Sequence, residues 1–293
     1  MSDEPHGLLV IDKPRGITSH DAVAQARRLF GTRSVGHAGT LDPMATGVLV
    51  LLFGEACKLS SYLTADDKTY VTRVLFGIGT DSFDADGTET QRIELPSGFP
   101  EHEQLDAALA AEQARREQVP PSVSAIHDRG VRAHVRVRRG ETLDLPPRAV
   151  ALHSLRLLDR DGASVCLELT VSKGFYVRAL ARDLGERLGA PAHLTELRRT
   201  ASGAFTLADA CSWPLAERPA LISLASAATR ALPKTLLNED GVRAARQGKV
   251  LHGEQARPSK LEAVSAWLGP DGALIALGVS SEDGLHQVVR GFR

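Results

Sequence analysis

The apolar run from Val48 to Phe53 constrains the fold of this chain more than any other feature of its sequence. Consecutive apolar residues of this kind, here following Gly47, are typical of a strand that is covered on both faces. The stretch 7–13 predicts a second buried strand, which Pro14 ends. Further strands are predicted at 68–77, 150–158, 165–171 and 197–205.

Helices are predicted between these strands. One begins after Thr18 and Ser19, either of which can cap a helix, and Gly31 can end it. Its apolar positions recur at helical spacing, at Val23, Ala26 and Phe30. Other helices are predicted at 55–63, at 101–117 and after Lys173-Gly174, where Leu180, Leu184 and Leu188 share one face.

The charge of the chain is nearly balanced, with a net charge of −1, which argues against an indiscriminate coat for nucleic acid. Basic residues nevertheless gather in three places, at 27–28, 129–148 and 178–199. A neutral protein with such local clusters can bind a polyanion over part of its surface. For any single cluster, ordinary solvated charge is the simpler interpretation.

Cysteine content and apolar segments bear on where such a protein works. The three cysteines lie far apart and form no Cys-x-x-Cys pair, so neither a disulfide framework nor a zinc site is predicted. The first residues lack the basic start and apolar run of a signal peptide. No stretch approaches the roughly 20 apolar residues that cross a bilayer. We therefore expect a cytoplasmic protein without a membrane partner.

Between Gly31 and Gly47 the sequence predicts a loop rich in glycine, threonine and proline, which contains Asp42. Its glycines permit unusual backbone conformations and close approach to a ligand, and Pro43 restricts the geometry of the carboxylate. An aspartate that caps a turn is the plain alternative. A phosphate-binding P-loop is excluded because the Gly-Lys-Ser/Thr ending is absent. A metal site through His37 and Asp42 would lack further ligands at suitable spacing.

The segment 36–47, GHAGTLDPMATG, resembles the catalytic motif of the TruB family of bacterial tRNA pseudouridine-55 synthases. Three further segments resemble motifs of this family in the same order, at 10–19, 67–70 and 172–178. The last of these is followed by a matching Asp-Leu-Gly at 183–185. The resemblance spans roughly residues 7–199, and four ordered motifs are a far stronger signal than one.

The resemblance implies the pseudouridine synthase fold, which is an α+β fold with a mixed, largely antiparallel central sheet and flanking helices. A catalytic domain is then expected at 1–230, with an RNA-gripping insertion at about 119–147. The pattern weakens around 227–233, which suggests a linker. The remaining part, 231–293, is short and turn-rich, and is expected to be a small β-rich, PUA-like RNA-binding module.

One carboxylate is chemically sufficient for this reaction, which cleaves the bond from C1′ to N1 and rejoins the same uracil through C5. No redox change occurs and no group is imported, so no cofactor and no metal are expected. Asp42 is expected to be the nucleophile, and Arg178 to pair with it, rather than to be a surface charge. Tyr70 is expected to stack on the uracil, with strand packing as its alternative; the resemblance also implies proton transfer through its hydroxyl.

Further residues are expected to contact the RNA or the flipped-out nucleotide. His37 could fill the space that the base vacates, and Tyr176 could line the pocket or pack in the core. Lys13 is expected to support the active-site loop or contact RNA. Arg132 and Arg136, in the basic insertion, are expected to bind RNA. The family usually has Lys and Tyr where this chain has His127 and His134, which puts individual RNA contacts of the insertion in doubt.

The function expected from these residues is isomerisation of uridine to pseudouridine at position 55, in the T-loop of tRNA. The expected partner is the T-loop and T-stem, with no obligate protein partner and a monomeric state. A guide-RNA-dependent synthase of the dyskerin/Cbf5 type is the first alternative, although no lysine-rich tail is evident. A non-catalytic tRNA-folding protein is the second. A glycosidase-like hydrolase is disfavoured because no second carboxylate motif accompanies Asp42.

Overall fold

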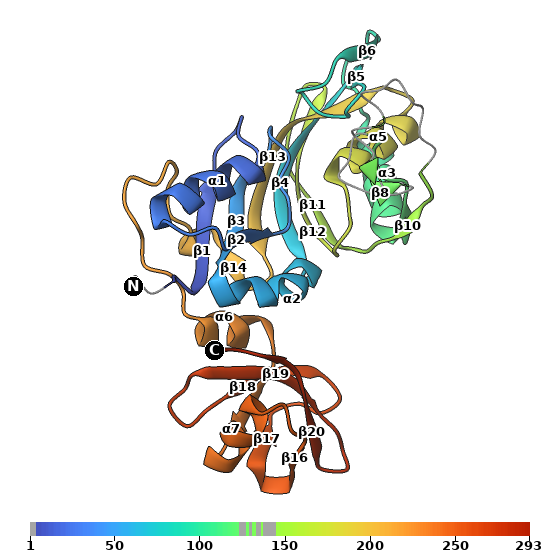
Figure 1. Cartoon of the computed structure of the whole chain (residues 1–293). Coiled ribbons are helices and arrows are strands. Elements are labelled where there is room, and N and C mark those ends of the chain that lie inside the picture. Colours follow the sequence, from blue (N-terminus) through green and yellow to red (C-terminus); the bar gives the residue numbers. More distant parts are fainter. Residues whose placement is uncertain (1–3, 123–126, 129–130, 133–135, 137–144) are drawn as a thin grey trace.

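Figure 1 shows the computed structural model of the chain, which describes residues 4–122, 127–128, 131–132, 136 and 145–293. Eight strands form its first sheet, in the order β1-β3-β13-β4-β12-β11, with β2 beside β3 and β14 beside β13. These strands are β1 (Gly7–Lys13), β2 (Val35–Ala38), β3 (Thr46–Phe53), β4 (Lys68–Phe76), β11 (Leu152–Asp161), β12 (Ser164–Val171), β13 (Ala192–Ser202) and β14 (Phe205–Thr206). All pairs are antiparallel except β3 with β13. The predicted mixed, largely antiparallel sheet of an α+β fold is confirmed.

The strand β3 lies between β1 and β13, and every residue from Gly47 to Phe53 is buried, as the apolar run predicts. Because side chains alternate along a strand, its two faces enter different cores. Leu49, Leu51 and Phe53 belong to one apolar cluster, and Val48, Val50 and Leu52 belong to another. Both faces are covered, which explains why the sequence of this strand is apolar throughout.

Helices cover the sheet, and none in the described part of the chain is long and apolar enough to cross a membrane. The predicted helix α1 (Ser19–Phe30) is capped by Thr18, which accepts from the Asp21 N–H at 3.0 Å, and ends at Gly31 in a left-handed conformation. Further helical segments up to residue 209 are η1 (Gly54–Leu59), α2 (Ser60–Ala65), α3 (His102–Ala114), α5 (Val177–Leu188) and η2 (Leu207–Asp209).

Part of the predicted loop 31–47 is a strand instead. Residues 35–38 form β2, which pairs antiparallel with β3 from Val35–Phe53 to Ala38–Val50. The glycine at position 36 gives this segment no strand signal of its own, so its conformation depends on the hydrogen bonds that β3 supplies. The Asp42 loop is therefore the short connection between two paired strands rather than a long free segment.

Short hairpins project from the first sheet. The strands β5 (Ile78–Thr80) and β6 (Glu89–Arg92) pair with each other on either side of a polar turn. The expected insertion is enclosed by a pair of two-residue strands, β7 (Glu117–Gln118) and β10 (Arg148–Ala149). Within it, β8 (His127–Asp128) pairs with β9 (Val131–Arg132).

A second sheet contains six strands, in the order β16-β20-β19-β18-β15-β17, which confirms that the C-terminal part is β-rich. Its elements are β15 (Lys234–Leu237), α7 (Glu239–Arg246), β16 (Leu251–His252), η3 (Gly253–Gln255), β17 (Ala256–Pro258), β18 (Val264–Leu268), β19 (Leu274–Ser280) and β20 (Leu285–Gly291). Figure 1 shows it as the orange and red part, below the first sheet.

Residues 227–233, where a linker is expected, are largely helical, because residues 224–231 form the helix α6 (Leu224–Ala231). Ala227 and Ala228 are buried in the apolar cluster that also contains residues of both sheets. Small alanine side chains give only a weak apolar pattern in the sequence. They nevertheless allow the helix to pack closely between two layers. The boundary expected at 230/231 stays a prediction.

Candidate active site

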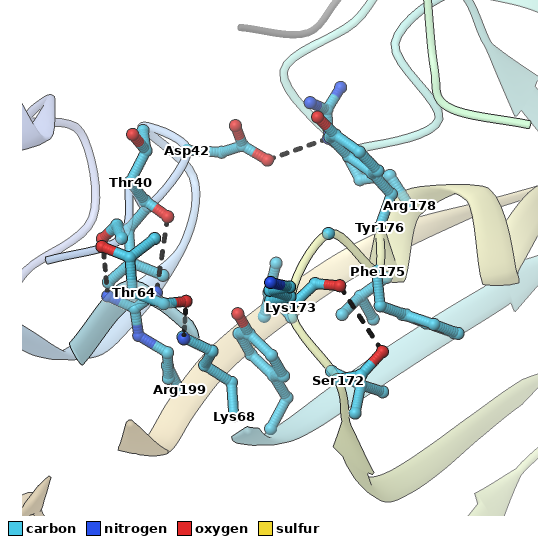
Figure 2. A pocket seen from close by; sticks show the side chains of 17 residues that line it. Thr40, Asp42, Thr64, Lys68, Ser172, Lys173, Phe175, Tyr176, Arg178 and Arg199 are labelled. Carbon is cyan, nitrogen blue, oxygen red and sulfur yellow. Dashed lines mark hydrogen bonds and ion pairs between the residues drawn. The ribbon is translucent and has the colours of Figure 1, made fainter. Parts of the chain in front are cut away.

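A cavity of about 310 Å³ opens between the Asp42 loop, β4 and the turn that leads into α5 (Figure 2). Its lining includes Asp42, Tyr70, Tyr176 and Arg178, four of the residues that the sequence singled out. They come from three separate segments of the chain, and the order of the sheet brings these segments together. No group of three or more His, Cys, Asp or Glu that could hold a metal ion occurs in the described part of the chain.

The side chains of Asp42 and Arg178 form an ion pair in which the Arg178 Nε lies 2.9 Å from the Asp42 Oδ2 (Figure 2). Arg178 belongs to the first turn of α5, and its side chain is only 5% exposed, whereas that of Asp42 is 36% exposed. The guanidinium is thus fixed inside the protein while the carboxylate faces the cavity. A carboxylate in this position can reach a bound group without losing its counter-charge.

A second carboxylate, Asp84, lies on the same guanidinium, with its Oδ2 3.5 Å from the Arg178 Nε. Ser82 completes the contact, because its carbonyl accepts from Arg178 at 2.9 Å and its hydroxyl donates to Asp84 at 2.6 Å. The sequence analysis did not select Asp84. Its side chain also accepts from the Asp86 N–H at 3.1 Å, an Asx-type contact that is common for aspartate in turns.

The sequence analysis noted that no second carboxylate motif accompanies Asp42. The structure brings the Asp84 carboxylate to the same guanidinium from a distant turn. The Asp84 side chain is 6% exposed and is not among the residues that line the cavity. It can therefore orient Arg178, but it is not placed to act on a group in the cavity as a second glycosidase carboxylate would.

Arg199 restrains the Asp42 loop through backbone carbonyls. The sequence analysis did not select this residue. Arg199 is 1% exposed and donates to the carbonyls of Val48 at 2.7 Å, Gly39 at 3.0 Å and Thr40 at 3.4 Å. A buried guanidinium whose donors all meet backbone carbonyls restrains the conformation of those residues. No side-chain motif in the sequence predicts that Arg199 restrains the loop, since the acceptors are main-chain oxygens.

Lys13 holds the other end of the loop. Its ammonium donates to the carbonyls of Pro14 at 2.9 Å, Ile17 at 2.8 Å and Pro43 at 3.4 Å. Burial lowers the pKa of Lys13 to about 8, although the nearby Asp42 charge opposes this. Because the side chain is completely buried, the RNA contact expected as one of its two roles does not fit the structure. Support of the active-site loop is the role that its contacts allow.

The helix α1 also supports the Asp42 loop. Its Ser19 hydroxyl accepts from the Leu41 N–H at 2.9 Å. The same hydroxyl lies 3.2 Å from the Leu41 carbonyl. The Gly16 N–H donates to the Pro43 carbonyl at 2.8 Å. The segment 10–19, singled out as a motif in the sequence, is thus the support on which the aspartate loop rests.

Two tyrosines form part of the cavity wall. Tyr70 lies on β4 and is 9% exposed, so it is largely buried, with part of its surface on the cavity. Tyr176 precedes α5, and its backbone is clamped by the buried side chain of Gln118. The amide oxygen of Gln118 accepts from the Tyr176 N–H at 2.8 Å, and its NH₂ group donates to the Tyr176 carbonyl at 3.1 Å. This clamp ties the start of α5 to the base of the insertion.

Lys68 is a further cavity residue that the sequence analysis did not select. Its ammonium donates to the Thr64 carbonyl at 2.7 Å, and its side chain is almost completely buried (Figure 2). Burial lowers the pKa of Lys68 to about 8, and the charge of Arg199 acts in the same direction. Two buried cations, Lys68 and Arg199, thus line the same cavity.

Two of the expected RNA-binding residues, His37 and Arg136, are not among the residues that line the cavity. His37 lies on β2, and its ring meets that of His20 edge-on at 5.6 Å between centroids. Burial lowers the pKa of His37, and it is not among the cavity-lining residues. Arg136 is partly buried and also lies outside the lining. The side chain of Arg132, like the whole of His134, lies outside the described residues.

Comparison with known families places this architecture in a defined class. Residues 27–177 match the model of the TruB family pseudouridylate synthase N-terminal domain. Residues 178–230 match the model of the tRNA pseudouridylate synthase B C-terminal domain. The first match covers more than half of the chain and contains the cavity residues up to Val177.

Individual relatives agree with the family models. The tRNA pseudouridine synthase B of Thermobifida fusca is 40% identical over 292 residues, which is 97% of each chain. The protein of the same name from an Arthrobacter species is 43% identical over 92% of each chain. That of a Synechococcus species is 47% identical over 73% of this chain and 71% of its own.

Solved structures share the fold. A Cbf5–Nop10–Gar1 complex matches with a TM-score of 0.74 and 22% identity, over 98% of this chain and 84% of that one. An H/ACA ribonucleoprotein bound to a substrate RNA matches with a TM-score of 0.72 and 23% identity, over 98% and 85%. The fold and its relatives define a pseudouridine synthase, which is an isomerase. Within this class, the chain belongs to the TruB family.

Proposed function

We propose that this enzyme isomerises uridine to pseudouridine at position 55 in the T-loop of tRNA, without a guide RNA. Its relatives at 40–47% identity carry the name tRNA pseudouridine synthase B, and two of them align over more than 90% of both chains. The structures of guide-dependent assemblies are similar in fold but only 22–23% identical, so they favour no guide-dependent function here.

The observation that carries the mechanism is the position of Asp42. Its carboxylate faces the cavity, while the buried Arg178 stays within 2.9 Å and is itself held by Asp84 and Ser82. Asp42 is the nucleophile, and the fixed guanidinium balances its charge and sets the direction of the carboxylate. A preorganised charge of this kind needs no reorganisation during the reaction.

The target nucleotide leaves its stack and enters the cavity, because the atoms that react are inaccessible in a stacked loop. A cavity of about 310 Å³ falls in the size range of pockets that enclose a small molecule. Tyr70 provides an aromatic surface there, and stacking of a base on such a ring contributes roughly 1–3 kcal/mol. The uracil stays bound while its glycosidic bond moves from N1 to C5, so no redox partner is involved.

Competing chemistry is less compatible with this arrangement. A hydrolase that retains or inverts a glycoside uses two carboxylates facing the substrate. Asp84 is buried beside Arg178 and does not line the cavity. A protein that only folds tRNA would have no use for a guanidinium held between two carboxylates.

The partner in this proposal is tRNA, bound through its T-loop and T-stem. The basic insertion with Arg132 and Arg136 and the C-terminal module supply further RNA contacts. The enzyme acts as a monomer in the cytoplasm, with no obligate protein partner.

The test compares the purified protein with Asp42→Asn on an unmodified tRNA transcript, followed by mapping of pseudouridine. Loss of a nucleophile lowers the rate by roughly 10³-fold or more, so no product is expected from the variant. Asp106→Asn is the matched control, since Asp106 is an exposed carboxylate on α3 whose side chain is 59% accessible. Wild-type protein that makes no pseudouridine, or Asp42→Asn that makes as much as Asp106→Asn, would contradict the proposal.

A further inference from the structure

A second recess, of about 530 Å³, lies directly beside the active-site cavity. It is lined by residues of η1 and α2, by Lys173 from the turn before α5, and by Arg290 near the end of β20. Thr64 and Lys173 line both hollows, so the two adjoin. The recess therefore lies within reach of a strand whose nucleotide occupies the cavity.

The recess is rich in groups that bind anions. Lys173 and Arg290 are both exposed, and the hydroxyls of Ser60, Ser61 and Thr64 lie along the same wall. None of the described residues that line it is acidic. A guanidinium, an ammonium and neutral hydroxyls are the groups with which proteins contact the phosphates of a nucleic acid.

The position of Arg290 is fixed by contacts of the residues that follow it. The Lys58 ammonium donates to the Gly291 carbonyl at 2.9 Å and lies 5.4 Å from the centre of the Phe292 ring. Phe292 is buried in the apolar cluster that joins the two sheets, and the Arg293 N–H donates to Glu55 at 3.1 Å. The last strand is thus attached to η1, and Arg290 is held at the edge of the recess.

We propose that this recess binds the phosphodiester backbone of the RNA strand next to the target nucleotide, with Arg290 and Lys173 as its cationic contacts. The inference rests on the proposed RNA substrate and assigns it a path from the cavity toward the C-terminal module. The module thereby contributes a side chain to substrate binding at the active site, in addition to any contact made elsewhere. Lys58 has a structural part only, because Glu55 already pairs with it.

Binding of an unmodified tRNA transcript tests the proposal, measured by fluorescence anisotropy over a series of salt concentrations. The Asp42→Asn background prevents turnover during the measurement. Arg290→Ala is expected to weaken binding about three- to tenfold and to lower the slope of log K against log salt by roughly 0.7–0.9, the loss of one phosphate contact. Arg290→Lys keeps a positive charge and is expected to retain most of the slope.

Arg257→Ala is the matched control, because Arg257 is exposed on β17, at the opposite edge of the same sheet from β16 and β20. It is expected to leave both affinity and slope unchanged. In the background with intact Asp42, Arg290→Ala is expected to raise KM for tRNA while kcat changes by less than about twofold. Equal slopes for Arg290→Ala and Arg257→Ala would overturn the inference. Failure of the proposed function would appear separately, as RNA binding without pseudouridine.

Discussion

At the scale of single residues, the unusual feature is one arginine held by two carboxylates. Asp42 faces the cavity and Asp84 is buried, and both lie within 3.5 Å of the Arg178 Nε. A guanidinium that served Asp42 alone could turn with it. Because Asp84 contacts the same Nε and the Ser82 carbonyl accepts from another nitrogen of the guanidinium, the direction of the pair is set by the protein rather than by the substrate.

Replacement of Asp84 by Asn tests this division of roles. The variant keeps the shape of the side chain but removes the charge that faces Arg178, and hydrogen bonds to charged groups contribute roughly 1.5–3 kcal/mol. If most of this stabilisation is lost from the transition state, kcat falls about 10- to 100-fold. The rate of pseudouridine formation in a single turnover measures this fall.

Asp86 supplies the control for this experiment. It belongs to the same turn, but its side chain is 47% exposed and pairs with Arg15 at 3.3 Å on the surface. Asp86→Asn is expected to keep kcat within about twofold, since exposed ion pairs contribute little. A kcat for Asp84→Asn as high as that for Asp86→Asn would show that Arg178 needs no second carboxylate.

At the scale of elements, the Asp42 loop owes its position to strands that approach it closely. Gly47 begins the buried part of β3 with φ near +100°, and it pairs with Arg199 where β3 and β13 run parallel. A Cβ at this position would overlap the Arg199 carbonyl. The close approach of the two backbones allows Arg199 to reach the carbonyls of Gly39 and Thr40.

Gly47→Ala is therefore expected to separate β3 from β13 and to lower the free energy of unfolding by more than about 3 kcal/mol. Gly272→Ala is the control, since Gly272 has φ near +77° but open space around it. Its cost is limited to the backbone term of about 1–2 kcal/mol. Urea unfolding of both variants compares them, and equal losses would refute the role of the close approach.

At the scale of the whole molecule, the two sheets are parts of one packed body. A single apolar cluster contains Val48 and Val50 of the first sheet, Ala227 of α6, and Leu277 of the second sheet. The contact of β20 with η1 lies at the same junction. This packing places Arg290 of the C-terminal module at the recess that adjoins the active-site cavity, where the proposed RNA path crosses it.

The buried lysines make stability depend on pH. The pKa values of Lys13 and Lys68 fall to about 8 from 10.5, because burial disfavours the ammonium. Between these values the unfolded chain binds more protons than the folded protein, so the free energy of unfolding rises with pH in that window. Below pH 8 both states are protonated and the full cost of burial is present; above 10.5 it has disappeared.

Lys13→Met removes one of these groups. Relative to wild type, its free energy of unfolding is expected to decline between pH 8 and 10 by at most about 1.4 kcal/mol for each unit of pH. Denaturant unfolding at several pH values measures this difference. Lys260→Met changes an exposed lysine in the C-terminal module. Its free energy of unfolding is expected to depend on pH as that of wild type does. If the free energy of unfolding of Lys13→Met also depends on pH as that of wild type does, burial of Lys13 is not a cause of the pH dependence.

Local patterns in the sequence predicted most of the strands and helices, and the Asp42 loop. Apolar runs, helical spacing and capping residues act over a few neighbours, so they can be recognised without the fold. Asp42, Tyr70 and Arg178 could be selected because each lies in a segment with a recognisable motif. Their meeting in one cavity, along with the ion pair of Asp42 and Arg178, needed the order of the strands.

Only the tertiary structure decided the rest of the site. Asp84 acts through a residue far along the chain, and Arg199 binds backbone carbonyls, which leave no mark in the pattern of side chains. The strand β2, the helix α6 and the place of Arg290 likewise depend on packing partners that lie elsewhere in the chain. The sequence by itself identified the residues that we propose carry the chemistry, whereas long-range contacts determined how they are held, because burial and pairing exist only once the chain is folded.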